Sequence, residues 1–155
     1  MTRWLKLLVL WFSMGCVYYL IEIAYRSVIA GQITFPHPSM IIVGGLCGIS
    51  VGAINQLERF YDMRIRTQAV IGAVLTLVIE FIAGCVLNLW MGLNIWDYSG
   101  QPFNIMGQVC VLFGVIWYCI MPFAIWLEDK LRLDLNWNGK AYSLRGAYLD
   151  WFLGR

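Results

Sequence analysis

The stretch QAVIGAVLTLVIEFIAGCVLNLWMGL, residues 68–93, decides the fold of this chain. At about 1.5 Å of rise per residue, a helix of this length crosses a hydrocarbon core of roughly 30 Å with some tilt. Its centre carries one ionisable residue, Glu80. A carboxyl group at that depth costs about 2.5–3.5 kcal/mol to insert, so such groups usually face the interior of a helix bundle. We therefore predict a transmembrane helix over 68–93 with Glu80 turned toward other helices.

The small and polar residues of this stretch recur every four positions, which places them along one side of the predicted helix. They are Gly72, Thr76, Glu80, Gly84, Asn88 and Gly92. The remaining sides carry Val, Leu, Ile and Phe. This division is typical of a membrane helix that turns one side to other helices or to water and the rest to lipid.

The composition indicates a membrane protein along the whole chain. Of its 155 residues, 61% are hydrophobic and 13% are charged, whereas a soluble domain is about 25% charged. We predict an all-α, polytopic membrane protein, a single transmembrane domain over 1–155, with four transmembrane helices over about residues 4–25, 39–57, 68–93 and 104–127. Residues 128–155 are expected to form a short amphipathic cytoplasmic tail along the membrane surface.

The same composition excludes several functions. Four apolar runs leave no room for a soluble catalytic domain, and we predict that the chain is not an enzyme. The net charge of +2 is small and its basic residues are not clustered, so no nucleic-acid partner is expected. All five cysteines lie inside apolar runs without metal-ligand spacing, and the single histidine, His37, stands in a predicted loop. We therefore expect no metal and no cofactor.

The basic residues predict the orientation of the chain. Lys and Arg stand before the first run, between the second and third runs, and after the fourth run. The first predicted external loop has only Arg26 beside it, and the second has none. By the positive-inside rule, we expect both termini to lie on the cytoplasmic side of the membrane, which in a bacterium is the inner (cytoplasmic) membrane. We expect the first run to be retained as a helix, because it is longer than the apolar part of a signal peptide.

Two connecting segments and one ion pair complete this picture. Residues 27–38 are rich in turn formers and predict an external loop. Residues 57–68 mix charged with aromatic side chains and predict a short connection on the membrane surface. Glu22 and Arg26 are four residues apart, so we expect them to pair near the interface. Pro122 is expected to loosen or kink the end of the fourth helix.

Glu80 leads the candidates for a substrate or ion pathway, followed by Asn88, Asp97, Asn104 and Gln108. Since burial at this depth favours an uncharged group, we expect Glu80 to be at least partly protonated at neutral pH. Its proton would then be donated to Gln108, to Asn88 or to a backbone carbonyl. The alternative is that Glu80 only holds the helices together by hydrogen bonding.

Glycines form a second motif, on the run 39–57. Gly44, Gly48 and Gly52 make a GxxxGxxxG series that lets another helix approach closely, and Gly84 fits the same role on 68–93. We predict helix packing along these glycines; the alternative is a permeation path lined by backbone.

The stretch IEFIAGCVLNLWMGLNIWDYSGQPFNIMGQVCVLFGVIW, residues 79–117, carries a family resemblance. The likeness rests on a Glu in an apolar helix followed by Asn88, Trp96-Asp97-Tyr98-Ser99, Pro102, Asn104, Gly107 and Trp117. In these residues the chain resembles small bacterial integral membrane proteins described as putative ABC-transporter permeases (putative ABC-transporter type IV). The resemblance covers about the second half of the chain and implies a transport role.

The predicted function is therefore that of a membrane transport component. The chain has no GxxxxGK[ST] phosphate-binding loop, so an ATPase would have to be a separate chain. Four helices are few for a permease, which implies a homo-oligomer or another membrane subunit. One alternative is a structural or regulatory subunit that binds a membrane complex through its glycines. Another is a homo-oligomeric ion or proton pathway with Glu80 facing the axis.

Overall fold

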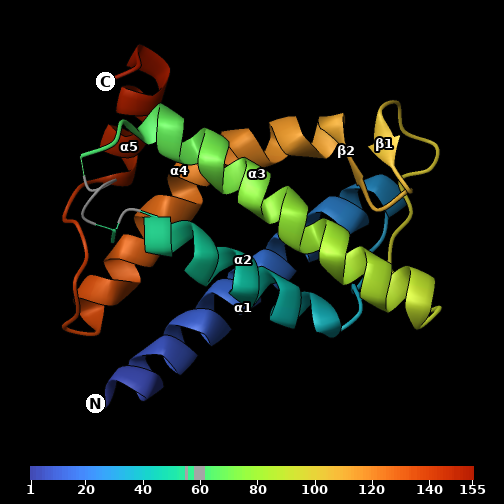
Figure 1. Ribbon diagram of the computed structural model, residues 1–155, viewed down its shortest axis with the longest axis horizontal. Coiled ribbons are helices and arrows are strands. Elements are labelled where there is room, and N and C mark those ends of the chain that lie inside the picture. The colour runs from blue at the N-terminus through green and yellow to red at the C-terminus, as the bar shows by residue number, and fades with distance from the viewer. Residues whose placement is uncertain (55, 58–61) are drawn as a thin grey trace.

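The structure, a computed structural model, describes residues 1–54, 56–57 and 62–155. Residues 58–61 of the predicted surface connection 57–68 lie outside this description, and its last four residues, 65–68, already belong to the helix that starts at Ile65. The described part is predominantly helical (Figure 1). Its elements are α1 (Arg3–Ala30), α2 (Ser39–Ile54), α3 (Ile65–Gly84), the π-helical turn η2 (Cys85–Trp90), β1 (Asn104–Ile105), β2 (Val109–Cys110), α4 (Val111–Asp134) and α5 (Leu144–Leu153).

Among the described residues, three helices are long and apolar enough to cross a membrane. They are α1, α3 continued by η2 (Ile65–Trp90), and α4. The shorter helix α2 has 16 residues, which gives a length of about 24 Å, less than the roughly 30 Å of a hydrocarbon core. Three of the four predicted runs are therefore helices of sufficient length and apolarity to span a membrane, and a span by α2 stays a prediction.

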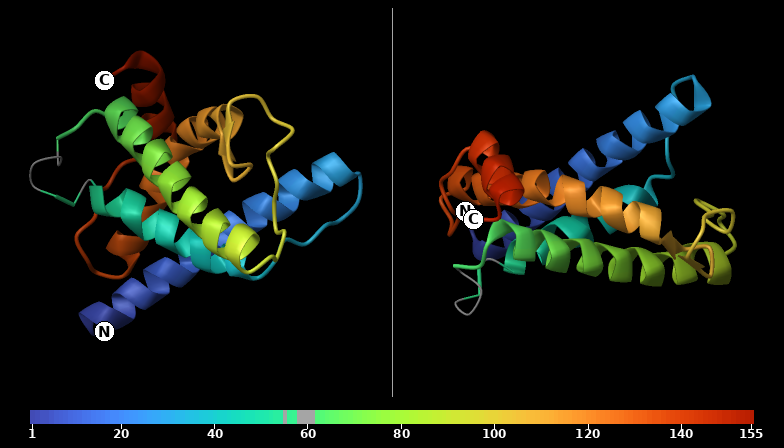
Figure 2. Two further views of the ribbon diagram at one scale, coloured as in Figure 1. Left: turned by 45° about the vertical axis from the view of Figure 1, so that its right-hand side comes forward. Right: turned by 90° about the horizontal axis from the view of Figure 1, so that it is seen from above.

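Successive helices run in alternating directions, so the loops gather at two ends (Figure 1). We call one the termini end, where residues 1–6, 62–66 and 134–155 lie, and the other the loop end, where residues 31–38 and 91–110 lie (Figures 1 and 2). Arg26 is the Lys or Arg nearest the loop end, and most other basic residues belong to the termini end. The charge asymmetry of the sequence therefore coincides with the two ends of the structure.

The exposed surface of α3 fits a lipid environment. Val70, Val74, Val78 and Ile82 follow one another at four-residue spacing and are each 49–58% exposed. The buried side of the same helix carries Ala69, Ala73, Thr76 and Glu80. Such an apolar stripe can face hydrocarbon without a cost in free energy, because lipid tails are as apolar as these side chains.

Glycines let α2 pack closely on its neighbours. A Cβ atom at Gly44 would overlap Tyr18 of α1, and one at Gly48 would overlap Met14 of the same helix. At Gly52 it would overlap the carboxyl group of Glu128 on α4. The glycine series therefore lies against helices of its own chain.

Several helix boundaries differ from those predicted: α1 continues to Ala30, past the expected end at residue 25 and into the predicted loop 27–38, and α4 differs at both ends. The run expected to be helical from residue 104 begins instead with a hairpin, in which Asn104 pairs with Cys110, and α4 starts at Val111. The Asn104 side chain accepts from the Gly107 N–H (3.0 Å), and Gly107 adopts a positive φ of 70°. Both features favour a turn over a helix. Two two-residue strands are thus added to the predicted all-α fold.

At its other end α4 continues to Asp134, seven residues past the predicted limit of 127. The charged residues there pair along the helix, Glu128 with Arg132 and Lys130 with Asp134, each four residues apart. Such pairs support a helix instead of ending it. Pro122 stands inside α4, and the helix changes direction along its length (Figure 1).

The predicted surface tail includes a short helix that packs on the bundle. Ser143 caps α5 by accepting from the Gly146 N–H (3.0 Å). The Arg66 guanidinium donates to the carbonyls of Trp151 and Phe152 at the other end of α5. The Tyr148 hydroxyl donates to the Cys119 carbonyl of α4 (3.2 Å). The helix is therefore anchored to both α3 and α4.

Candidate functional site

Three helices meet at the carboxyl group of Glu80. The residue is 4% exposed and lies on the buried side of α3. Its Oε1 accepts a hydrogen bond from the Tyr18 hydroxyl of α1 (2.7 Å), and its Oε2 accepts one from the Trp117 Nε1 of α4 (3.0 Å). The rings of Tyr18 and Trp117 stack with centroids 5.3 Å apart. The prediction that Glu80 faces other helices is confirmed.

The partners of Glu80 differ from those expected. Tyr18 and Trp117 take the places predicted for Gln108 and Asn88, which belong to a separate network nearer the loop end. Because both partners donate, Glu80 acts as an acceptor at each oxygen. The sequence did contain a signal for these partners. A buried Tyr hydroxyl or Trp N–H usually has a hydrogen-bond partner, so the Tyr and Trp residues of the apolar runs were candidates.

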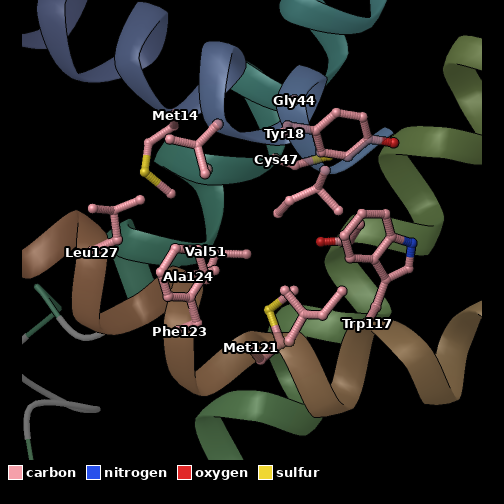
Figure 3. A pocket seen from close by; sticks show the side chains of 15 residues that line it. Met14, Tyr18, Gly44, Cys47, Val51, Trp117, Met121, Phe123, Ala124 and Leu127 are labelled. Atoms are coloured by element: carbon pink, nitrogen blue, oxygen red, sulfur yellow. The ribbon is translucent and has the colours of Figure 1, made fainter. Parts of the chain in front are cut away.

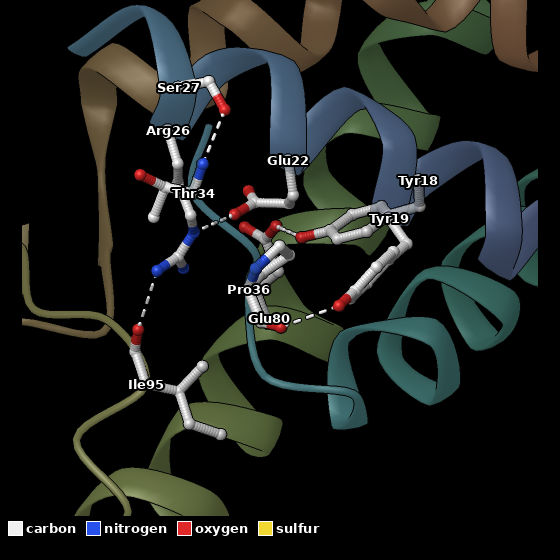
Figure 4. A network of polar contacts seen from close by, with 9 residues as sticks. All are labelled: Tyr18, Tyr19, Glu22, Arg26, Ser27, Thr34, Pro36, Glu80 and Ile95. Carbon is white, nitrogen blue, oxygen red and sulfur yellow. Dashed lines mark hydrogen bonds and ion pairs between the residues drawn. The ribbon is translucent and has the colours of Figure 1, made fainter. Parts of the chain in front are cut away.

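A second carboxyl group lies close to Glu80 on the loop-end side. Glu22, one helical turn beyond Tyr18, is 7% exposed and near enough for its charge to act on Glu80. Its Oε2 pairs with Arg26 at 2.8 Å, which confirms the predicted pair. Arg26 also donates to the Ile95 carbonyl (3.2 Å) (Figure 4). The Arg26 guanidinium therefore binds Glu22 and the loop that carries Ile95.

Asn88 and Gln108 bind each other and the loop that follows η2. The Asn88 amide donates to the Gln108 Oε1 (2.8 Å) and to the Trp96 carbonyl (3.0 Å), and its Oδ1 accepts from the Ile95 N–H (2.7 Å). Gln108 in turn lies against Gly84, where a Cβ would meet its side chain. These contacts fasten the loop end to the helices. A role for the two amides in a pathway stays a prediction.

Asp97 and Asn104 lie in the loop between η2 and α4. Asp97 is exposed and its Oδ1 accepts from the Ser99 hydroxyl and from the Ser99 N–H. These two bonds, the hydroxyl first, hold the pKa of Asp97 below its ordinary value. The Asn104 amide donates to the Gln101 carbonyl (2.8 Å). The structure therefore separates the five predicted pathway residues into Glu80, the Asn88–Gln108 pair, and two loop residues.

Sequence reasoning missed a buried ionic group at the termini end. Glu128 is 0% exposed and Arg132 is 6% exposed. The Arg132 Nε donates to the Glu128 Oε1 at 2.5 Å, and the guanidinium lies 4.6 Å from the centre of the Trp137 ring. Glu128 was assigned to a surface tail; the four-residue spacing from Arg132 was the signal that the helix continues.

Asp129, the next residue, ties α4 to the chain that follows it. Its carboxylate accepts from the Tyr142 hydroxyl (3.0 Å), from the Lys140 backbone N–H (3.1 Å) and from the Gln56 amide (3.2 Å). Burial, and then the charge of Asp129, raises the pKa of Tyr142 above its ordinary value. The termini end therefore holds two adjacent buried carboxyl groups with several donors around them.

A cavity of about 40 Å³ lies among side chains of α1, α2, α3 and α4, and neither Glu80 nor Glu128 lines it (Figure 3). Tyr18 and Trp117, which bind Glu80, line it together with Thr76. Leu127, the residue before Glu128, also lines it. Most of the other lining side chains are apolar.

The described residues contain no group of three His, Cys, Asp or Glu placed to hold a metal ion. His37 is exposed, and its Nδ1 lies 2.9 Å from the Ser39 hydroxyl. The described cysteines are free thiols.

Long apolar helices around a buried carboxyl group define the class of this protein, a polytopic α-helical membrane protein. The chain belongs to the family described as putative ABC-transporter type IV, whose family model matches residues 9–139. The match extends well beyond the resemblance in the second half of the chain and includes Tyr18, Glu80, Trp117 and Glu128. No curated protein matches the chain, and no solved structure matches it.

Proposed function

We propose that this protein is the permease-like membrane subunit of a transporter, with no catalytic chemistry of its own. The observation that carries the proposal is Glu80, a carboxyl group held inside the bundle by one residue of α1 and one of α4. A carboxyl group can bind a proton or cation, and ionisable groups within membrane helices commonly mark substrate or ion paths. The family description supports the transport role.

We propose further that a separate ATPase drives this subunit. The chain lacks the GxxxxGK[ST] loop that cradles nucleotide phosphates. ATP hydrolysis would therefore have to come from a second chain bound at the termini end, the cytoplasmic side in the proposed orientation. A homo-oligomer or a second membrane subunit would complete the small helix bundle.

Two rival functions lose their structural basis. A partner protein cannot dock on the glycine series of α2, because Tyr18, Met14 and Glu128 already cover it. A pathway on an axis between copies needs Glu80 on the outer surface, but the residue is 4% exposed within one chain. Any pathway that uses Glu80 has to run inside the chain.

Affinity purification from the organism's own membranes tests the transport proposal. The tagged protein, extracted in a mild detergent after chemical crosslinking, should carry with it a chain that has a phosphate-binding loop, and the complex should hydrolyse ATP. A complex without any nucleotide-binding chain would overturn the proposed ATPase partnership. Another membrane protein with the same tag and similar abundance serves as the control for non-specific capture.

The Glu80→Gln variant tests the role of the carboxyl group in that same complex. Gln keeps the size and one acceptor oxygen but binds no proton. We expect the variant to retain its partners and to lose the coupling of ATP hydrolysis to transport. Hydrolysis and transport equal to those of the unaltered complex would contradict a functional role for Glu80.

A further inference from the structure

Two buried carboxyl groups lie on either side of the central cavity, Glu80 in the middle of the bundle and Glu128 at the termini end. We propose that they are the two stations of a proton pathway that runs through a single chain. The inference rests on the proposed role of Glu80, but it requires no ATPase partner.

The spacing along α4 shows how the two stations are related. Trp117, which donates to Glu80, and Glu128 are eleven residues apart on this helix, a rise of about 16 Å. The cavity occupies the space between, since its lining extends from Trp117 to Leu127 along α4. On α2, Gly48 lines the cavity, and Gly52, one turn further, touches the Glu128 carboxyl group.

Two buried polar atoms lack a described partner, one on a residue that lines this cavity, Thr76, and one on Glu128, the residue after the lining residue Leu127. Thr76 Oγ1 is buried and makes no hydrogen bond among the described residues, although the Cys47 thiol lies beside it. Glu128 Oε2 is likewise buried without a described partner. Since more than about 90% of buried polar groups are hydrogen-bonded, each of the two atoms has room for a further hydrogen-bond partner such as water.

Water fits that position. The cavity of about 40 Å³ exceeds the roughly 10–15 Å³ that one water molecule requires on this measure. Thr76 Oγ1 and the Tyr18 hydroxyl oxygen offer hydrogen-bonding atoms at the Glu80 side. Hydration of the cavity would therefore place water between the Tyr18 hydroxyl, which binds Glu80, and the end of the cavity next to Glu128.

The transfer needs no electrons and no further reactant. The proton leaves the Glu80 carboxyl group for a water molecule in the cavity, and the Glu128 carboxylate accepts it through Oε2. Glu80 then takes a replacement proton from the loop-end side, where Glu22 is its neighbour. Arg132 holds Oε1 of Glu128 throughout and leaves Oε2 to exchange the proton.

The charged and titratable neighbours of both stations come from several elements. Around Glu80 they are Tyr18 and Glu22 of α1, with Arg26 bound to Glu22, Cys47 of α2, and Tyr98 of the loop before α4. Around Glu128 they are Asp129 and Arg132 of α4 and, through Asp129, Tyr142 of the segment before α5. Each station thus has a proton-binding neighbour on the side away from the cavity, Glu22 for Glu80 and Asp129 for Glu128.

The apolar lining makes hydration of the cavity the slow step. Water gains few hydrogen bonds among such side chains, so a change in their polarity should change the rate of proton passage. Thr76→Val removes the hydroxyl that α3 contributes to the cavity lining, and Ala124→Ser adds one on the α4 side (Figure 3).

Proton uptake by proteoliposomes tests the pathway. Vesicles that contain the purified full chain and an internal pH-sensitive dye are given a potassium diffusion potential with valinomycin. We expect uptake above that of protein-free vesicles, and its loss to the protein-free level in Glu80→Gln and in Glu128→Gln. Asp134→Asn, on the same helix but with a side chain 58% exposed, should conduct like the unaltered chain.

Several results would overturn the pathway. Uptake no greater than in protein-free vesicles would do so, as would unaltered uptake in either Gln variant whose size-exclusion profile and helix content are normal. If Glu128→Gln does not fold, the cavity pair decides: Thr76→Val should slow uptake and Ala124→Ser should speed it. No change in that pair excludes the cavity as the route. If the proteoliposomes show no uptake but the affinity purification captures an ATPase, the proton pathway is refuted and the transport proposal remains intact.

Discussion

At the scale of single residues, the Glu80 carboxyl group is the hydrogen-bond acceptor for two buried donors. Glu80→Ala would leave the Tyr18 hydroxyl and the Trp117 N–H without an acceptor, at about 1–3 kcal/mol for each unsatisfied group. We expect a clear fall in the thermal unfolding temperature in detergent, and a smaller fall for Glu80→Gln. Val78→Ala, on the exposed side of the same helix, is the control; an equal fall there would contradict the assignment.

Sequence alone located Glu80 but not its partners. A single ionisable residue in a long apolar stretch is a local signal, and its cost in lipid makes it conspicuous. Tyr18 and Trp117 lie 62 and 37 residues away in the chain, and their meeting depends on how three helices pack. Glu128 was missed for the opposite reason, since its charge resembles that of a surface residue until Arg132 and Gly52 are seen to enclose it.

At the scale of elements, close packing of α2 on α1 should tolerate no added volume. Gly48→Leu would force a side chain into Met14, and such overpacking costs about 1–3 kcal/mol. Leu46→Ala, at a position 44% exposed, removes contacts that lipid can replace. We expect the first variant to unfold at a lower temperature than the second in the same detergent. Equal stability of the two would remove the case for this helix contact.

The anchoring of α5 gives a second prediction at this scale. Arg66→Ala removes the donors to the carbonyls of Trp151 and Phe152, so the amides of residues 144–153 should exchange with deuterium faster. Arg145→Ala, an exposed position within α5, serves as the control and should leave exchange unchanged. Unaltered exchange in Arg66→Ala would show that the Tyr148 hydrogen bond to the Cys119 carbonyl and the contact of the Trp151 ring with that of Tyr118 on α4 hold the helix by themselves.

The helices themselves were predictable because each is a long apolar run, but their ends were not. The start of α4 was placed too early, since the turn at 104–110 depends on one Asn side chain and on positive φ angles. The end of α4 was predicted too early because the charged residues that follow residue 127 resembled a segment at the membrane interface. Boundaries of this kind depend on side-chain contacts that hydropathy does not register.

At the scale of the whole molecule, the proposed orientation predicts which ends are accessible. In a cysteine-free background, single cysteines at His37 and Gly100, both exposed at the loop end, should react with an impermeant reagent added outside intact cells. Cysteines at Asp62 and Asn138, exposed at the termini end, should react only after permeabilisation. Outside labelling at position 62 would reverse the proposed orientation.

The arrangement of the helices was only partly visible in the sequence. The glycine series correctly indicated a close helix contact, but its periodicity does not tell whether the neighbour belongs to the same chain or to another. The structure places α1 against it. For the same reason, the sequence could not distinguish a Glu80 that faces an axis between copies from one that faces its own bundle.

The most direct test of the central claim is an infrared difference spectrum of the Glu80 carboxyl group in proteoliposomes. The band that is absent in Glu80→Gln identifies this group. If Tyr18 donates to it, Tyr18→Phe should shift that band, while Tyr19→Phe, whose hydroxyl binds the Pro36 carbonyl instead (Figure 4), should leave it in place. A band unchanged in Tyr18→Phe, or shifted equally by both variants, would contradict the account of Glu80 as the polar centre of the bundle.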